Sequence, residues 1–144
     1  MSLDGHYDPG NIFAKIIRGE APCAKVYEDD DVLAFLDLFP QGRGHTLVIP
    51  KAGEARNLFD VDPNVLSRLI LGVRKVAGGV RKALNPDGIV ITQFNGAPAG
   101  QTVYHLHVHI IPRFEGVALA GHGGGRMADT VELAALAKEI GAQI

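Results

Sequence analysis

The stretch TVYHLHVHIIPR, residues 102–113, places three of the chain's six histidines two residues apart. His105, His107 and His109 alternate with apolar residues, which is the period of a β-strand. We therefore predict a strand over 103–111 with all three imidazoles on one face, because successive side chains of a strand point to opposite faces. The opposite, core-facing set would be Tyr104, Leu106, Val108 and Ile110.

Three interpretations of this histidine strand are open. In the first, the imidazoles form a solvated face, although three alternating histidines are improbable by chance. In the second they bind zinc, but the adjoining loop offers no carboxylate or cysteine as a further ligand. The third is covalent catalysis, since an imidazole is a good nucleophile towards phosphorus and neighbouring imidazoles can orient it. The loop NGAPAGQT, residues 95–102, favours catalysis, because its backbone N–H groups, amide and hydroxyl suit phosphate oxygens or a leaving group.

The segments around this strand predict an α+β domain, an antiparallel sheet with helices packed on one side. Asn11 and Asp62 are candidate helix N-caps, and Gly19 is a candidate stop signal. Amphipathic spacing predicts helices at 11–20, 63–84 and 129–140. Alternating apolar runs predict further strands at 24–29, 31–37, 44–51 and 89–95.

Composition narrows the function classes. The 144 residues carry a net charge of -2, which is too balanced for a protein that neutralises the phosphates of duplex nucleic acid. The first ten residues lack the basic and apolar regions of a signal peptide, and no apolar run approaches the roughly 20 residues that span a bilayer. A single cysteine excludes an intramolecular disulfide and a cysteine-rich zinc site. We expect a cytoplasmic protein with no nucleic-acid or membrane partner.

The chain is expected to divide into three regions. Residues 1–10 form a loose N-terminal arm, and residues 11–113 form the domain that contains the sheet. Residues 114–144 form a C-terminal tail, in which the glycine-rich link GHGGGR, residues 121–126, precedes a short helix. His122 and Arg126 of this link are interpreted as surface residues.

The histidine stretch resembles the H-φ-H-φ-H-φ-φ pattern of the histidine triad (HIT) superfamily. Similar motifs cover about residues 11–113, among them NIFAKIIRGEAP, VYEDDDVLAFLD, GHTLVIPK and GQTVY. The opening motif is most similar to the Hint-type branch, the purine nucleoside phosphoramidases, and to its bacterial members. The resemblance implies a five-stranded antiparallel sheet with one long and one short helix. It also implies a homodimer that joins two such sheets, and a purine nucleotide substrate.

The resemblance implies a role for each polar residue of the site. His107 would attack the α-phosphorus and form a nucleotidyl-histidine, while His109 would contact the phosphate oxygens. His105 and His45 would supply supporting hydrogen bonds. Nearer the substrate, the expected residues are Thr102 at the leaving group, Gln101 and Asn95 around the phosphate and ribose, and Asp37 on the ribose hydroxyls. The apolar slot for the base would comprise Ile12, Phe13, Ile16, Phe35, Leu38 and Leu47, although Ile16 and Leu47 fit an ordinary core equally well.

The sequence also departs from some relatives. Certain bacterial members carry Cys-x-x-Cys at the start of the first helix and bind zinc with two histidines. Asn11 and Ala14 occupy those positions here, so we expect no zinc and no other cofactor, with His45 and His105 left as a metal-free pair. Nucleotide-transferring relatives often have glutamine at the third histidine, so His109 points to hydrolysis.

These observations predict an enzyme that hydrolyses the P–N bond of purine nucleoside 5′-phosphoramidates through His107. The first alternative is a dinucleoside polyphosphate hydrolase, because GQTV before the triad and PR after it also occur in that branch. A nucleotide-binding regulatory module with little turnover and a metal-binding protein are alternatives of a different class.

Overall fold

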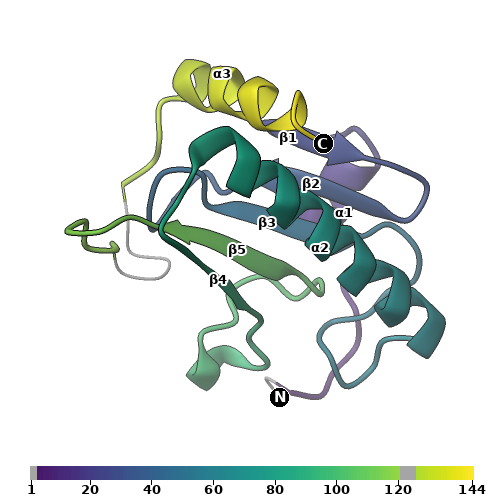
Figure 1. The fold of residues 1–144 in the computed structure, drawn as a ribbon. Helices are drawn as coiled ribbons and strands as arrows, with labels where there is room; N and C mark the ends of the chain where they lie inside the picture. Colours follow the sequence, from purple (N-terminus) through teal and green to yellow (C-terminus); the bar gives the residue numbers. More distant parts are fainter. Residues whose placement is uncertain (1–2, 121–125) are drawn as a thin grey trace.

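The computed structural model describes residues 3–120 and 126–144, and its centre is a five-stranded antiparallel sheet (Figure 1). The strand order across the sheet is β1-β2-β3-β5-β4. The strands are β1 (Lys25–Glu28), β2 (Val32–Leu36), β3 (Thr46–Pro50), β4 (Gly88–Thr92) and β5 (Val108–Arg113). The predicted α+β class and five-stranded antiparallel sheet are therefore confirmed. His122 and most of the predicted glycine-rich link lie outside the described residues.

Three helices cover the sheet: α1 (Ile12–Ile17), α2 (Pro63–Leu84) and α3 (Thr130–Gly141). The long helix α2 and the C-terminal helix α3 pack side by side on one face (Figure 1). Their apolar side chains form one core with Val32, Ala34 and Val48, which point to that face. α1 lies on the other face, where Phe13 packs against Phe35. The expectation of helices on one side, one long and one short, is therefore wrong for α1, because both faces of β2 and β3 are apolar and each needs a cover.

The helices begin where the sequence predicted. The Asn11 side chain accepts a hydrogen bond from the Ala14 N–H, and the Asp62 side chain accepts from the Asn64 N–H. Gly19 follows α1 with φ +75°, a conformation that ends a helix easily in glycine. The tail is part of the core, since Leu133 and Ile140 of α3 are buried against the same cluster as α2.

The strand predicted over 103–111 begins only at Val108, so that prediction is wrong at its N-terminal half. The neighbours end there: β3 pairs with β5 from Val108 onward, and β4 reaches no further than Thr92, opposite His109. Before Val108 the chain bends, and the Leu106 N–H donates to the Ala55 carbonyl instead of to a strand. Among the described residues no helix is both long and apolar enough to cross a membrane.

Candidate active site

The cross-strand register builds the site on the face that α1 covers. Phe35 of β2 pairs with Leu47 of β3, and Leu47 pairs with His109 of β5, so the three side chains form a row across the sheet. His107 lies beside this row, with its ring edge-on to Phe13 of α1 at a centroid distance of 4.9 Å. All four histidines of the predicted site are at least 94% buried, so the interpretation as a solvated histidine face is wrong.

A backbone carbonyl fixes the tautomer of His107. Its Nδ1 lies 2.7 Å from the His105 carbonyl oxygen, and because a carbonyl only accepts, the proton is on Nδ1. In the neutral imidazole the lone pair is therefore on Nε2. The site thus holds one buried imidazole whose nucleophilic nitrogen is determined by the main chain.

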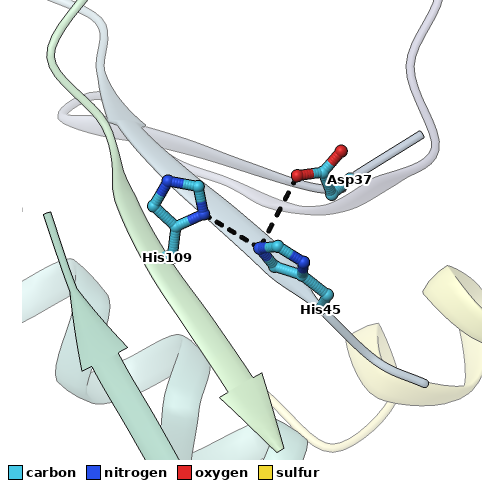
Figure 2. Close-up of side chains that lie close together, drawn as sticks. All are labelled: Asp37, His45 and His109. Carbon is cyan, nitrogen blue, oxygen red and sulfur yellow. Dashed lines mark hydrogen bonds and ion pairs between the residues drawn. The ribbon is translucent and has the colours of Figure 1, made fainter. Parts of the chain in front are cut away.

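His45 and His109 adopt the other tautomer, with the proton on Nε2, and a backbone N–H determines this. The Gln41 N–H donates to His45 Nδ1 at 3.0 Å, which leaves the His45 proton on Nε2. That nitrogen lies 2.9 Å from His109 Nδ1, so His45 donates and His109 accepts (Figure 2). The remaining proton of His109 is then on its own Nε2. His107 and His109, with ring centroids 5.0 Å apart, thus have complementary roles, a lone pair on one and an N–H on the other.

Asp37 lies beside this relay, next to the His45 nitrogen that bonds to His109. One carboxylate oxygen is 3.6 Å from His45 Nε2 (Figure 2). The other accepts a hydrogen bond from the Phe39 N–H. Asp37, His45 and His109 bring their possible ligand atoms within 4.8 Å of one another, close enough for a metal ion. However, a metal on His45 Nε2 needs a lone pair there, and the Gln41 N–H directs the proton to that nitrogen. This geometry suits a hydrogen-bond relay better than a metal site.

The residues at the zinc positions of Cys-x-x-Cys relatives do not fit that metal. The Asn11 side chain is engaged as the cap of α1, and Ala14 has no ligand atom. Cys23, the chain's single cysteine, is exposed. The two histidines at the other zinc positions lie apart in the hydrogen-bond network: His45 bonds to His109, whereas His105 bonds to Pro50 and Tyr7.

His105 holds the site from its other end. Its Nε2 lies 3.1 Å from the Pro50 carbonyl oxygen and must donate, so Nδ1 is an acceptor, and the Tyr7 hydroxyl donates to it at 2.6 Å. Burial lowers the pKa of His105 below its ordinary value, and the bond to Pro50 offsets this only in part. The imidazole is therefore neutral and bonded at both nitrogens.

Sequence reasoning missed two of these partners. Tyr7 lies in the arm that was expected to be loose, and the one available signal was a lone aromatic residue among polar ones. The Gln41 N–H is a main-chain group whose role depends on the loop between β2 and β3, so no residue type indicates it.

The side-chain amides of Gln101 and Asn95, which were expected to line the phosphate, form hydrogen bonds that hold the glycine-rich loop in place. Gln101 is buried; its oxygen accepts from the Gly96 N–H and its nitrogen donates to the Arg56 carbonyl. Asn95 accepts from the Leu58 N–H. Both side chains hold the loop together, and the short 3-10 helix η1 (Ala97–Ala99) lies between them. Thr102, which follows Gln101, is exposed.

The residues of the expected base slot divide into a floor and a rim. Phe13, Phe35 and Leu47 are buried in one apolar cluster, against which the half-buried Ile16 packs. Ile12 and Leu38 are 47% and 39% exposed. The floor is thus packed core, and the rim offers apolar surface beside the histidines and Asp37.

Known proteins are similar to this chain in both fold and sequence. The HIT domain family matches residues 18–116, which include the whole sheet and all four histidines of the site. A HIT-like protein of Bartonella henselae, described as involved in cell-cycle regulation and crystallised with an unknown ligand, has a TM-score of 0.88 and 52% identity, covering 96% of this chain and 100% of that one. A HIT-like protein of Methanocaldococcus jannaschii is 53% identical over 106 residues, which are 73% of this chain and 80% of its own.

A plant relative carries a named activity. An adenylylsulfatase of Arabidopsis thaliana is 43% identical over 104 residues, which are 72% of this chain and 52% of its own length. HIT domain proteins bind nucleotides and act as hydrolases or transferases. Because the family match includes the sheet together with the histidines it positions, this chain belongs to the HIT domain family.

Proposed function

We propose that this protein is a Hint-type phosphoramidase, which hydrolyses the P–N bond of purine nucleoside 5′-phosphoramidates and releases the nucleoside monophosphate. The observation that carries the proposal is the 2.7 Å hydrogen bond from His107 Nδ1 to the His105 carbonyl, which leaves a lone pair on His107 Nε2. A buried imidazole whose Nδ1 is held by a backbone carbonyl, so that Nε2 can attack, is the nucleophile that covalent catalysis at phosphorus requires.

The reaction would proceed in two displacements. His107 Nε2 attacks the α-phosphorus, the P–N bond breaks, and the leaving nitrogen takes up a proton from solvent through the Thr102 hydroxyl. The positive charge that develops on His107 is stabilised by the His105 carbonyl, which still accepts from Nδ1. His109 Nε2–H donates to a phosphate oxygen as charge builds there. Water then attacks the phosphorus and gives up a proton to solvent, so that a P–O bond replaces the bond from phosphorus to His107 Nε2 and the histidine is free again.

The nucleoside would lie against the α1 face. A carboxylate suits two vicinal ribose hydroxyls, and Asp37 lies beside the His45–His109 relay. The base would cover the exposed apolar rim of Ile12 and Leu38, with Phe13, Phe35, Ile16 and Leu47 as the packed floor below. Gln101 and Asn95 would contribute by holding the loop that faces the phosphate.

We also propose a homodimer that joins two sheets through β4. This strand is an edge of the sheet, and its Val90 and Ile91 are 38% and 48% exposed. An unpaired edge with apolar side chains is a ready template for a second copy. Light scattering should give about twice the 15.3 kDa of one chain, and a mass near 15.3 kDa would contradict the dimer.

The test of the function is AMP release from adenosine 5′-phosphoramidate by the wild type and by His107→Asn. The asparagine amide can still donate to the His105 carbonyl, so the fold is preserved while the nucleophile is lost. The matched control is His6→Asn, which changes an exposed histidine in the same way. Mass spectrometry of acid-quenched protein should find a nucleotidyl adduct on the wild type only. Release by His107→Asn at the wild-type rate would refute the mechanism.

The Arabidopsis relative favours adenylyl sulfate as a second candidate substrate. The same attack by His107 would expel sulfate, which leaves without a proton, whereas an amine needs one. Thr102→Val should therefore slow cleavage of the phosphoramidate and leave cleavage of adenylyl sulfate almost unchanged. Equal loss on both substrates would show that Thr102 acts on something other than the leaving group.

A further inference from the structure

The N-terminal arm is bound to the domain along its length. The Asn57 side chain donates to the Leu3 carbonyl at 3.1 Å, and Arg18 donates to the Pro9 carbonyl at 2.8 Å. Between these anchors the Tyr7 hydroxyl reaches His105, 98 residues away in the sequence. The Tyr7 ring also meets the His105 ring edge-on, with centroids 5.7 Å apart. The arm therefore places the Tyr7 hydroxyl against His105, the residue whose carbonyl determines the tautomer of His107.

We propose that Tyr7 is a positioning residue for His107, and that it acts through His105. The proposal rests on the function proposed above. Two hydrogen bonds that meet at His105 connect Tyr7 to His107. The Tyr7 hydroxyl donates to the His105 ring, and the His105 carbonyl accepts from the His107 ring. Tyr7 would thus orient the nucleophile through His105.

The direction of each hydrogen bond supports this connection. The Pro50 carbonyl can only accept, so His105 carries its proton on Nε2 and presents a lone pair from Nδ1. The Tyr7 hydroxyl must then be the donor. Burial, the largest influence, raises the pKa of Tyr7, so the phenol keeps the proton that it donates. Each group in this chain of hydrogen bonds is therefore a defined donor or acceptor. Of these groups, the Tyr7 hydroxyl is the one that a substitution can remove without changing a histidine or a backbone atom.

His105 needs such an anchor because the sheet does not hold it. The ladder with β3 begins at Val108, three residues later, so no strand pairing sets the direction of the His105 carbonyl. The peptide between His105 and Leu106 is held by the Leu106 N–H, which donates to the Ala55 carbonyl, and by the two bonds of the His105 ring. Loss of the Tyr7 bond would allow the ring to tilt and the carbonyl to turn away from His107.

The test compares Tyr7→Phe with Tyr104→Phe. The first change removes the hydroxyl and keeps the ring contact with His105. The second removes a phenol hydroxyl next to the same histidine, from a ring that lies under the Arg56 guanidinium. We expect Tyr7→Phe to lower kcat on adenosine 5′-phosphoramidate about tenfold with KM unchanged, because the orientation of the nucleophile matters only in the transition state. Tyr104→Phe should retain wild-type kinetics. Wild-type kcat in Tyr7→Phe would overturn the proposal.

A spectroscopic measurement separates positioning from a general structural role. Long-range ¹H–¹⁵N spectra of histidine-labelled protein report which ring nitrogen carries the proton. In the wild type, His107 should be protonated on Nδ1 and His105 on Nε2. In Tyr7→Phe, the His107 nitrogens should move towards the averaged shifts of a mixed tautomer, while those of His109 remain unchanged. A slower variant whose His107 signals are unaltered would also overturn the proposal.

The wild-type spectrum keeps the proposal testable by itself. If Tyr7→Phe does not fold, finding His105 protonated on Nδ1 in the wild type would exclude a donation from Tyr7 and refute the connection. If the wild type releases no AMP, the proposed substrate fails, whereas the tautomer comparison still decides whether Tyr7 orients His107.

Discussion

The face of the sheet under α2 and α3 buries Val32, Val48 and Ile110, whereas the face under α1 buries His107 and His109. On the first face, stability follows from apolar area removed from water, and any close-packed set of side chains of similar volume would serve. On the second face each buried imidazole needs a partner, and the partners are mostly backbone groups whose direction the fold determines. One sheet therefore carries its larger apolar core on one face, and on the other it holds the residues that position its chemistry beside a smaller apolar cluster.

The largest loss of activity should come from His107→Asn, which changes only the face of the sheet that holds the histidines. We expect turnover to fall by at least about 10⁴-fold, as for the loss of a covalent nucleophile, with the melting temperature within a few degrees of the wild type. Kinetics and thermal unfolding of the same preparation would check both parts. A large loss of stability would show that the two faces are not separable.

Leu69→Ala makes the opposite change, in the core under α2. Leu69 is 1% exposed, and its truncation should lower the free energy of unfolding by about 3 kcal/mol. Because α2 lies across the sheet from the histidines, kcat per folded molecule should stay at the wild-type value. Urea unfolding and active-site titration measure the two quantities, and a changed kcat would contradict the separation.

The relay that ends at His109 can be tested with two substitutions of His45. His45→Phe removes the donor to His109 Nδ1 and should lower kcat about thirtyfold, because His109 then loses its fixed tautomer. His45→Gln places an amide N–H near the same position and should cost less than about fivefold. Equal losses in the two variants would indicate that packing, not hydrogen bonding, is the role of His45.

The smallest effect concerns pH. Burial lowers the pKa of His105, so the folded protein keeps this imidazole neutral while the unfolded chain protonates it below about pH 6.5. Above that pH both states hold the neutral imidazole, so the protonation of His105 does not change stability. As the pH falls from about 6.5 towards the lowered folded-state value, the unfolded state binds more protons and stability decreases, by up to about 1.4 kcal/mol per pH unit. His105→Gln should show a shallower slope between pH 7.5 and 5, and an equal slope would remove His105 as the cause.

The same division explains what could be predicted from the sequence. Apolar periodicity predicted α2 and its start at Asp62, because helix patterns and caps are local. Alternation predicted a strand through His105, but a strand also needs a neighbour, and β4 ends opposite His109. The identities of the histidines indicated nucleotide chemistry, whereas their tautomers depend on main-chain groups that no residue type indicates. One is the Gln41 N–H, in the loop before His45, and the other is the Pro50 carbonyl, far from His105 in the chain. Tyr7 escaped notice for the same reason, since its contact spans 98 residues.

The opposite tautomers of His107 and His109 also have a consequence for the design of inhibitors. Because His107 presents a lone pair and His109 an N–H, a ligand should bind in one orientation. Its electron-poor centre should lie against His107, and an acceptor oxygen should lie against His109. A tetrahedral sulfamoyl group offers both at the spacing of a phosphate, and it brings no full negative charge against buried side chains. We therefore expect neutral sulfamoyl nucleosides to compete with the nucleotide, and their binding to vary less with salt concentration than that of a phosphonate.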